Sequence, residues 1–127
     1  MASFSSFSEI HAWRSAKELS LGCYALTDTE PLDRDFGLKD QLRRAAVSVM
    51  SNIAEGFGRG GDREFARFLH IARGSATEVC SLLYLIIDLH AHLADQARDL
   101  LDLADKTILL IARLTTYLTR SLEVSSS

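Results

Sequence analysis

The sequence has little of what several protein classes require. It contains one proline and seven glycines in 127 residues, and four of those glycines lie within 56–61. Because proline and glycine interrupt helices, their scarcity elsewhere predicts a mostly helical chain. The two cysteines, Cys23 and Cys80, form no CxxC pair, which excludes a zinc-ribbon site and favours free thiols in a reducing compartment.

Long hydrophobic runs and an excess of basic charge are also missing. The longest apolar runs, 82–87 and 108–112, are far shorter than the roughly 20 residues that cross a bilayer. Residues 1–8 lack the basic and apolar regions of a secretory signal, so we expect a cytoplasmic protein with no membrane association. Lys and Arg number 14 against 17 Asp and Glu, a net charge of −3, which excludes a uniformly basic nucleic-acid binder.

Apolar side chains recur at steps of three and four residues along most of the chain. Hydrophobic residues make up 47% of it, enough for a buried core. A period near 3.6 predicts amphipathic helices, which are expected at about 9–28, 36–57, 62–91 and 95–122. Short connections favour antiparallel neighbours, so the sequence predicts an all-α, up-down-up-down four-helix bundle as a single domain over residues 9–122.

Helix-breaking and capping residues set the expected boundaries. Pro31 ends the first helix, and the glycine cluster at 56–61 ends the second. That cluster follows a helix and has no P-loop lysine, so it predicts a helix stop and not a nucleotide loop. Asp62 and Asp95 are expected to cap the third and fourth helices. The serine-rich ends, 1–8 and 123–127, are expected to be disordered tails.

A polar stripe lies beside the apolar one on the second predicted helix and continues on the third. If these helices fold back near residues 59–60, Arg44 faces Ser75 and Gln41 faces Glu78. We therefore predict an Arg44–Glu78 ion pair within a partly buried polar seam. A solvated face without a role is the alternative. The predicted seam consists of Gln41, Arg44, Ser48, Asn52, Glu55, Ser75 and Glu78.

Charge is unevenly distributed along the chain. Residues 39–73 contain seven basic and four acidic side chains, whereas 78–105 contain one basic and six acidic. Arginines suit bidentate contact with phosphate, and those at 59, 63 and 67 are spaced to share one helix stripe. The sequence thus predicts weak, sequence-independent binding of RNA or DNA backbone through Arg43, Arg59, Arg63 and Arg67. Arginines that are only solvated or paired with nearby acids are the alternative.

Residues that carry catalysis or bind metals are sparse in the sequence. His90 and His92 are two apart, so on a helix they point to different sides and cannot chelate as an i, i+4 pair can. Glu55 beside Asn52 has no accompanying nucleophile in the sequence. We expect a non-enzymatic protein with no catalytic residues, no metal and no cofactor.

Two stretches of sequence resemble a known family. They are residues 41–59, with QLRRAAVS followed by NIAEGFGR, and residues 64–78, with EFxxFLxIARGSxxE. The resemblance is to the four-helix-bundle proteins first described from 23S rRNA intervening sequences, and it covers about 7–120. It implies a ring-shaped homopentamer and similarity to the accessory protein of diversity-generating retroelements, a pentamer that engages a reverse transcriptase and nucleic acid. No established enzymatic activity comes with it.

Two classes of function therefore stay open. The first is a nucleic-acid-associated accessory protein that uses the arginine-rich face. The second is a homo-oligomeric protein-interaction scaffold in which oppositely charged regions of neighbouring subunits attract one another. The third helix carries apolar residues beyond its main stripe, which favours an oligomer in either case. They are Ile71, Tyr84, Leu85 and Ile87.

Overall fold

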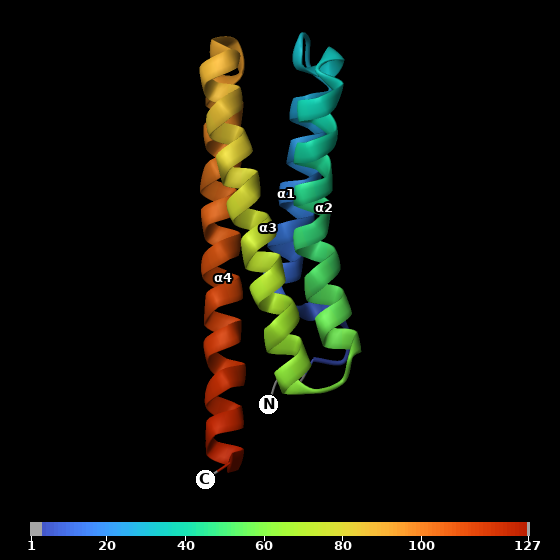
Figure 1. Cartoon of the computed structure of the whole chain (residues 1–127), viewed down its shortest axis with the longest axis vertical. Helices are drawn as coiled ribbons and strands as arrows, with labels where there is room; N and C mark the ends of the chain where they lie inside the picture. The colour runs from blue at the N-terminus through green and yellow to red at the C-terminus, as the bar shows by residue number, and fades with distance from the viewer. Residues whose placement is uncertain (1–3, 127) are drawn as a thin grey trace.

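The computed structural model describes the backbone of residues 4–126 and the side chains in that range other than those of 121 and 124–126. Within it, the long helices are α1 (His11–Thr27), α2 (Phe36–Gly58), α3 (Asp62–Leu89) and α4 (Ala94–Ser126). The short 3-10 segments are η1 (Phe7–Glu9), η2 (Leu32–Arg34) and η3 (Ala91–Leu93). The described residues include no strand, and successive helices run antiparallel, with α1 also packed on α4 (Figure 1). The predicted up-down-up-down four-helix bundle is confirmed.

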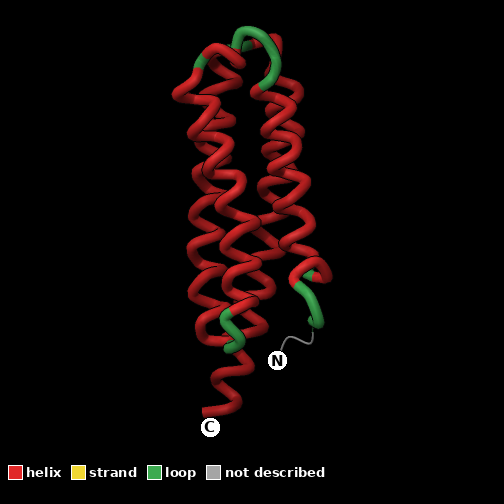
Figure 2. Tube along the Cα trace, turned by 90° about the vertical axis from the view of Figure 1, so that its right-hand side faces the viewer, coloured by secondary structure: helices red, strands yellow, loops and turns green. Residues whose placement is uncertain are grey.

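The bundle has two ends of different character. The α1–α2 and α3–α4 connections lie together at one, which we call the loop end (Figure 2). There His92 Nε2 lies 3.0 Å from the backbone oxygen of Glu30, which joins the two connections. The α2–α3 turn lies at the opposite end, which we call the turn end, and α4 extends beyond it (Figures 1 and 2).

Local chemistry explains where the helices begin and end. Asp35 caps α2 by accepting a hydrogen bond from the backbone N–H of Leu38 at 3.2 Å. Gly60 has a φ of 89°, which permits the reversal between α2 and α3. The predicted caps at Asp62 and Asp95 are wrong, because Gly61 occupies the N-cap of α3 and both aspartates lie within the first helical turns. Their charge still favours those termini.

The predicted disordered tails need correction where the structure describes them. At the N-terminus, Phe4 packs against the core, and the Phe7 ring lies 4.9 Å from that of Trp13. These aromatic anchors hold η1 against the bundle despite the serine-rich composition. At the C-terminus, α4 continues to Ser126, beyond the predicted end at 122. Residues 1–3 and 127 lie outside the described residues.

The core divides into two clusters along the bundle axis. One, around Leu19, Leu42 and Leu83, fills the loop half, and the other, around Ile53 and Ile111, fills the turn half. The predicted α2 stripe is buried throughout, at Leu38, Leu42, Ala45, Val49 and Ile53. Of the helices described here, none combines the length and apolar character needed to cross a membrane.

Candidate nucleic-acid interface

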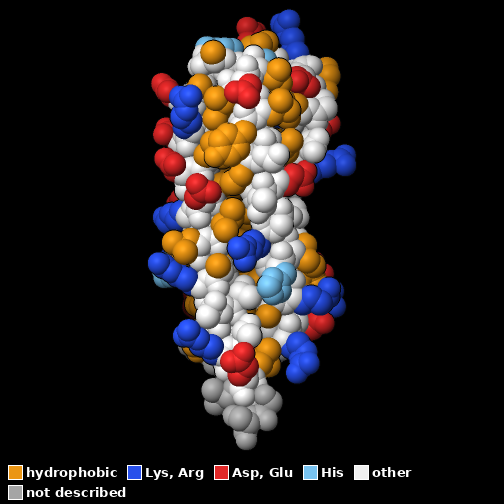
Figure 3. Space-filling view, turned by 60° about the vertical axis from the view of Figure 1, so that its left-hand side comes forward, with side chains coloured by type: hydrophobic (Ala, Val, Ile, Leu, Met, Phe, Trp, Pro, Cys, Tyr) orange, Lys and Arg blue, Asp and Glu red, His pale blue; other side chains and the backbone are white. Residues whose placement is uncertain are grey.

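Charged side chains separate along the bundle axis. Residues 20–47 and 77–105, which form the loop half, carry five basic and eleven acidic side chains. The rest of the chain, which forms the turn half, carries nine basic and six acidic side chains. Acidic side chains accordingly gather in the upper, loop-end part of the face in Figure 3. The bundle thus has a net charge of −6 in one half and +3 in the other, and a polyanion is attracted to the turn half.

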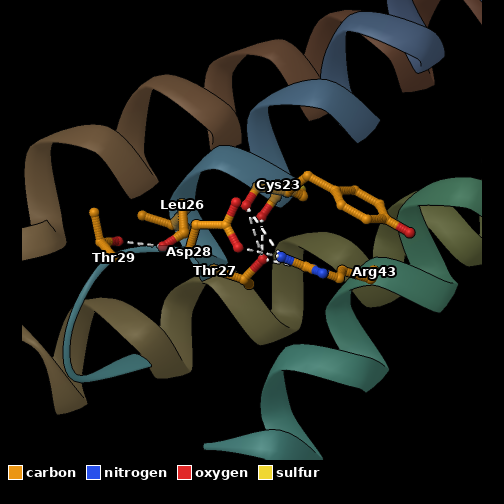
Figure 4. Close-up of polar contacts among 7 residues, drawn as sticks. Cys23, Leu26, Thr27, Asp28, Thr29 and Arg43 are labelled. Carbon is orange, nitrogen blue, oxygen red and sulfur yellow. Dashed lines mark hydrogen bonds and ion pairs between the residues drawn. The ribbon is translucent and has the colours of Figure 1, made fainter. Parts of the chain in front are cut away.

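Arg43 lies apart from the other predicted arginines. It projects from α2 towards the end of α1, where its Nε donates to Thr27 Oγ1 at 2.8 Å and its guanidinium pairs with Asp28 at 2.8 Å (Figure 4). The guanidinium carbon also lies 4.2 Å from the centre of the Tyr24 ring. Its side chain is only 20% exposed. Arg43 therefore fastens α1 to α2.

The predicted four-arginine face does not form as one surface. Arg43 lies in the loop half, 16 residues before Arg59, which corresponds to about 24 Å along a helix axis. The remaining three arginines stay close together, because Arg59 follows α2 and the other two lie in the first turns of α3. The predicted interface is thus reduced to Arg59, Arg63 and Arg67.

Two of these three arginines are partly neutralised by their own neighbours. Arg59 pairs with Glu55 and Arg67 with Glu64, each at 3.0 Å. Both guanidiniums also approach the Phe68 ring, at 5.1 and 4.6 Å from its centre. They remain about half exposed, so their outer donors are available to an anion. 

Arg63 lies at the same end and differs from the other two arginines in its contacts. It is exposed and forms no ion pair with any side chain that the structure describes. The turn end therefore presents one unpaired and two paired arginines.

The centre of the polar seam joins α2 to α3. The hydroxyls of Ser48 and Ser75 lie 2.9 Å apart, and Asn52 donates to both the backbone oxygen and the hydroxyl of Ser48, at 2.8 and 3.0 Å. All three residues are half-buried. Short polar side chains thus satisfy one another where the two helices meet.

The outer members of the seam behave differently. Gln41 Nε2 donates to Glu78 Oε2 at 3.2 Å, which agrees with the prediction that these two residues face each other across α2 and α3. Arg44 and Glu78, in contrast, form no ion pair among the described contacts. The predicted Arg44–Glu78 pair is therefore wrong. Both side chains are exposed, where water solvates each charge and pairing contributes little. Glu55 lies at the edge of the seam and binds Arg59.

Sequence reasoning missed a second group of turn-half arginines. Arg73 on α3, and Arg113 and Arg120 on α4, are exposed and make no ion pair within the described residues. Arg113 and Arg120 are seven residues apart, so two helical turns place them on one face. That spacing is the signal in the sequence. Arg73 is already counted in the basic segment 39–73, whereas Arg113 and Arg120 lie outside both segments, 39–73 and 78–105, on whose charges the prediction was based.

Metal-ligating side chains do not converge within the described part of the chain. No set of three or more His, Cys, Asp or Glu residues there is placed to hold a metal ion. The rings of His90 and His92 lie 6.1 Å apart, and His92 contacts a backbone oxygen. The expected absence of a metal, a cofactor and catalytic residues stays a prediction.

The chain matches the model of a known protein family. A family model described as 23S rRNA-intervening sequence protein matches residues 8–113. No curated protein matches the chain. The matched range contains α1, α2, α3 and about the first three-fifths of α4. It includes both the polar seam and Arg59, Arg63 and Arg67 of the turn end.

Proposed function

The chain belongs to the family of 23S rRNA-intervening sequence proteins, and we propose that it is a non-enzymatic, nucleic-acid-associated accessory protein. It binds the backbone of RNA or DNA weakly through the turn end of the bundle. The observation that carries this proposal is the charge separation, with a net charge of +3 in the turn half of a molecule whose total is −3. Arg59, Arg63 and Arg67 are the contacts that lie at the end itself.

Phosphate contact through these arginines accounts for both the weakness and the lack of sequence preference. Guanidiniums bind phosphate oxygens in a bidentate manner without reading bases. Glu55 and Glu64 compete for two of the three guanidiniums, and the acidic loop half repels the rest of the polyanion. Binding by such a surface is dominated by counterion release.

Salt-dependent binding tests this proposal. Wild-type protein should shift mixed RNA or DNA at low salt. Its affinity should fall about 20- to 40-fold between about 50 and 200 mM salt, since each phosphate contact contributes about 0.7 to 0.9 to the slope of log affinity against log salt. The triple variant Arg59→Glu, Arg63→Glu, Arg67→Glu should not bind. Its control, Arg34→Glu, Arg44→Glu, Arg98→Glu, has the same net charge but changes only exposed loop-half arginines, and it should bind nearly as wild type does. Absence of any wild-type shift at low salt would refute the proposal.

A homo-oligomeric scaffold is the second candidate function, and a particular surface favours it. α3 leaves Ile71, Leu85 and Leu89 exposed at 43%, 46% and 55% of their surface. Large apolar side chains in this number on one helix favour burial against another subunit. The oppositely charged halves would add attraction between copies.

The family resemblance makes a cyclic homopentamer our first choice of assembly. Light scattering should give a mass several times the 14.1 kDa of one chain at micromolar concentration. A mass of one chain would exclude the scaffold, and a dimer or tetramer would exclude only the pentamer. We also propose a cytoplasmic location, in keeping with two free cysteines.

A further inference from the structure

Two hollows share a border on the turn half of α4. One, of about 440 Å³, is lined by His70 of α3 and by α4 residues Thr115, Thr116, Thr119, Arg120 and Glu123. The other, of about 340 Å³, is lined by Ala112, Arg113, Thr116, Tyr117 and Arg120. Thr116 and Arg120 line both, so the hollows form one continuous surface, which we call the α4 groove. It lies on α4 and the neighbouring side of α3, and neither Arg59 nor Arg67 lines it.

The polar groups of the α4 groove favour an anion. Arg113 and Arg120 make no ion pair within the described residues, although Glu123 also lines the groove. The guanidinium donors of both arginines are therefore open to a ligand. They differ in this from Arg59 and Arg67, each of which already has a glutamate partner.

The threonines of the groove also differ in whether their hydroxyls already have a hydrogen-bond partner. Thr115 and Thr119 donate their hydroxyl hydrogens to backbone oxygens one turn earlier, each at 2.8 Å. The Thr116 hydroxyl makes no hydrogen bond with any described residue, and Thr116 lines both hollows. Its hydroxyl adds a neutral donor beside the Arg120 guanidinium. A phosphate seated there would meet charged and neutral donors together.

An aromatic ring distinguishes the α4 groove from a simple anion site. Tyr117 is 48% exposed and lines the smaller hollow with Arg113 and Arg120, at spacings of four and three residues. These spacings place all three side chains on one side of the helix. An exposed ring between arginines is the combination that binds single strands, in which bases stack and phosphates pair with cations.

The dimensions agree with a short stretch of strand. Arg113 and Arg120 are separated by about 10 Å along the helix axis. A stacked strand rises about 3.4 Å per nucleotide, so this separation corresponds to roughly three nucleotides. A base paired in a duplex has no free face for Tyr117, and a free phosphate would gain nothing from the ring.

We infer that the α4 groove binds a single-stranded nucleic-acid segment, with Arg113, Arg120 and Thr116 on its phosphates and Tyr117 stacked on a base. This inference rests on the proposed function and adds to it a second contact surface and a preference for unpaired strands. His70, across the larger hollow, provides a further donor from α3.

Fluorescence anisotropy with a labelled oligouridine tests the inference on the full-length protein at low salt. Arg113→Gln with Arg120→Gln should weaken binding at least tenfold and reduce the slope of log affinity against log salt by about 1.4, since each single-strand phosphate contact contributes about 0.7. Tyr117→Leu should weaken binding about tenfold. Tyr117→Phe keeps the ring and should bind as wild type does. The control, Arg34→Gln with Arg98→Gln, removes equal charge from the loop half and should change affinity less than twofold.

The outcomes separate this inference from the proposed function. If wild-type protein binds and the groove variants bind equally well, the groove inference is wrong and the turn-end proposal stands. If a duplex of matched length binds as tightly as the single strand and Tyr117→Leu has no effect, the preference for unpaired bases is wrong. The circular dichroism spectrum and the oligomer mass of each variant must match those of wild type. If only Tyr117→Leu misfolds, the groove inference is still tested by comparing Arg113→Gln with Arg120→Gln against its control, Arg34→Gln with Arg98→Gln.

Discussion

Gly56 of α2 packs directly against Phe68 of α3. A Cβ atom added to Gly56 would be 2.6 Å from Phe68 Cβ and 3.3 Å from the backbone oxygen of Phe65. Neither neighbour is the flexible end of a side chain, so the helices can approach this closely only with glycine at position 56. The glycine of the Asn-Ile-Ala-Glu-Gly string is thus a packing residue inside α2, and it also precedes the turn.

This contact predicts opposite effects for two glycine substitutions. Gly56→Ala should destabilise the protein by about 1–3 kcal/mol, because α2 and α3 must separate or distort. Gly74→Ala should stabilise it by about 0.5–1 kcal/mol, because Gly74 is exposed within α3 and has nothing within 4 Å of an added Cβ. Urea denaturation measures both free energies of unfolding. A neutral Gly56→Ala would contradict the close packing.

Arg43 and Arg44 should differ sharply despite being neighbours. Arg43→Ala removes the hydrogen bond to Thr27, the ion pair with Asp28 and the stacking on Tyr24, and should cost about 1–3 kcal/mol of stability. Arg44→Ala removes an exposed side chain and should change the free energy of unfolding by less than about 0.5 kcal/mol. Equal effects on denaturation would show that Arg43 does not fasten the helices.

The hydroxyls of Ser15 and Thr107 form a buried hydrogen bond between α1 and α4, with 2.6 Å between the oxygens. Ser15→Ala or Thr107→Val alone should each cost about 1 kcal/mol. The double variant should cost less than the sum, because two apolar groups leave no buried donor unpaired. A double-mutant cycle by thermal or urea denaturation measures the coupling, expected at about 0.5–1.5 kcal/mol. Strict additivity would show that the two hydroxyls act independently.

Burial raises the pKa of the Cys23 thiol from 9.0 to about 12. The folded protein therefore holds the thiol proton that the unfolded chain releases above pH 9. The contribution to stability is complete below pH 9 and is lost as the pH rises towards 12. Wild type should lose about 1 kcal/mol more than Cys23→Ala between pH 8 and pH 10. Equal pH dependence of the two unfolding free energies would contradict this.

Thiol labelling at pH 8 gives an independent check on the same residue. The pKa of Cys80 is also raised, by burial and then by the nearby Asp105 carboxylate, but this thiol is only half-buried. Cys80 should be modified slowly in the native protein, whereas Cys23 should react only after unfolding. In Cys80→Ser, modification before unfolding would show that Cys23 is accessible.

The sequence predicted the helices well because their apolar periodicity is regular. The α2 stripe from Leu38 to Ile53 is wholly buried, and the predicted limits of α2 and α3 lie within two residues of the observed ones. Periodicity also placed Gln41 opposite Glu78 and brought Ser48 and Ser75 into the same seam.

The contacts of individual polar side chains were harder to predict than the buried faces of the helices. Arg43 and Arg44 differ by one step of about 100° around α2, which turns the first guanidinium towards α1 and the second towards water. The sequence does not show which helix lies on which side, so it could not assign their partners. Phe4 and Phe7 were similarly missed as anchors, because serines around them dominate the local composition.

The separation of charge gives the molecule an electric dipole moment along its longest axis. In the field of a polyanion this moment produces a torque, so the bundle rotates before any contact is made and arrives with its positive pole leading. A larger fraction of collisions is then productive than for a uniformly charged body of the same net charge. A complex with a polyanion formed in this orientation would leave the negative pole pointing outward, where it would be presented to any third molecule that approaches.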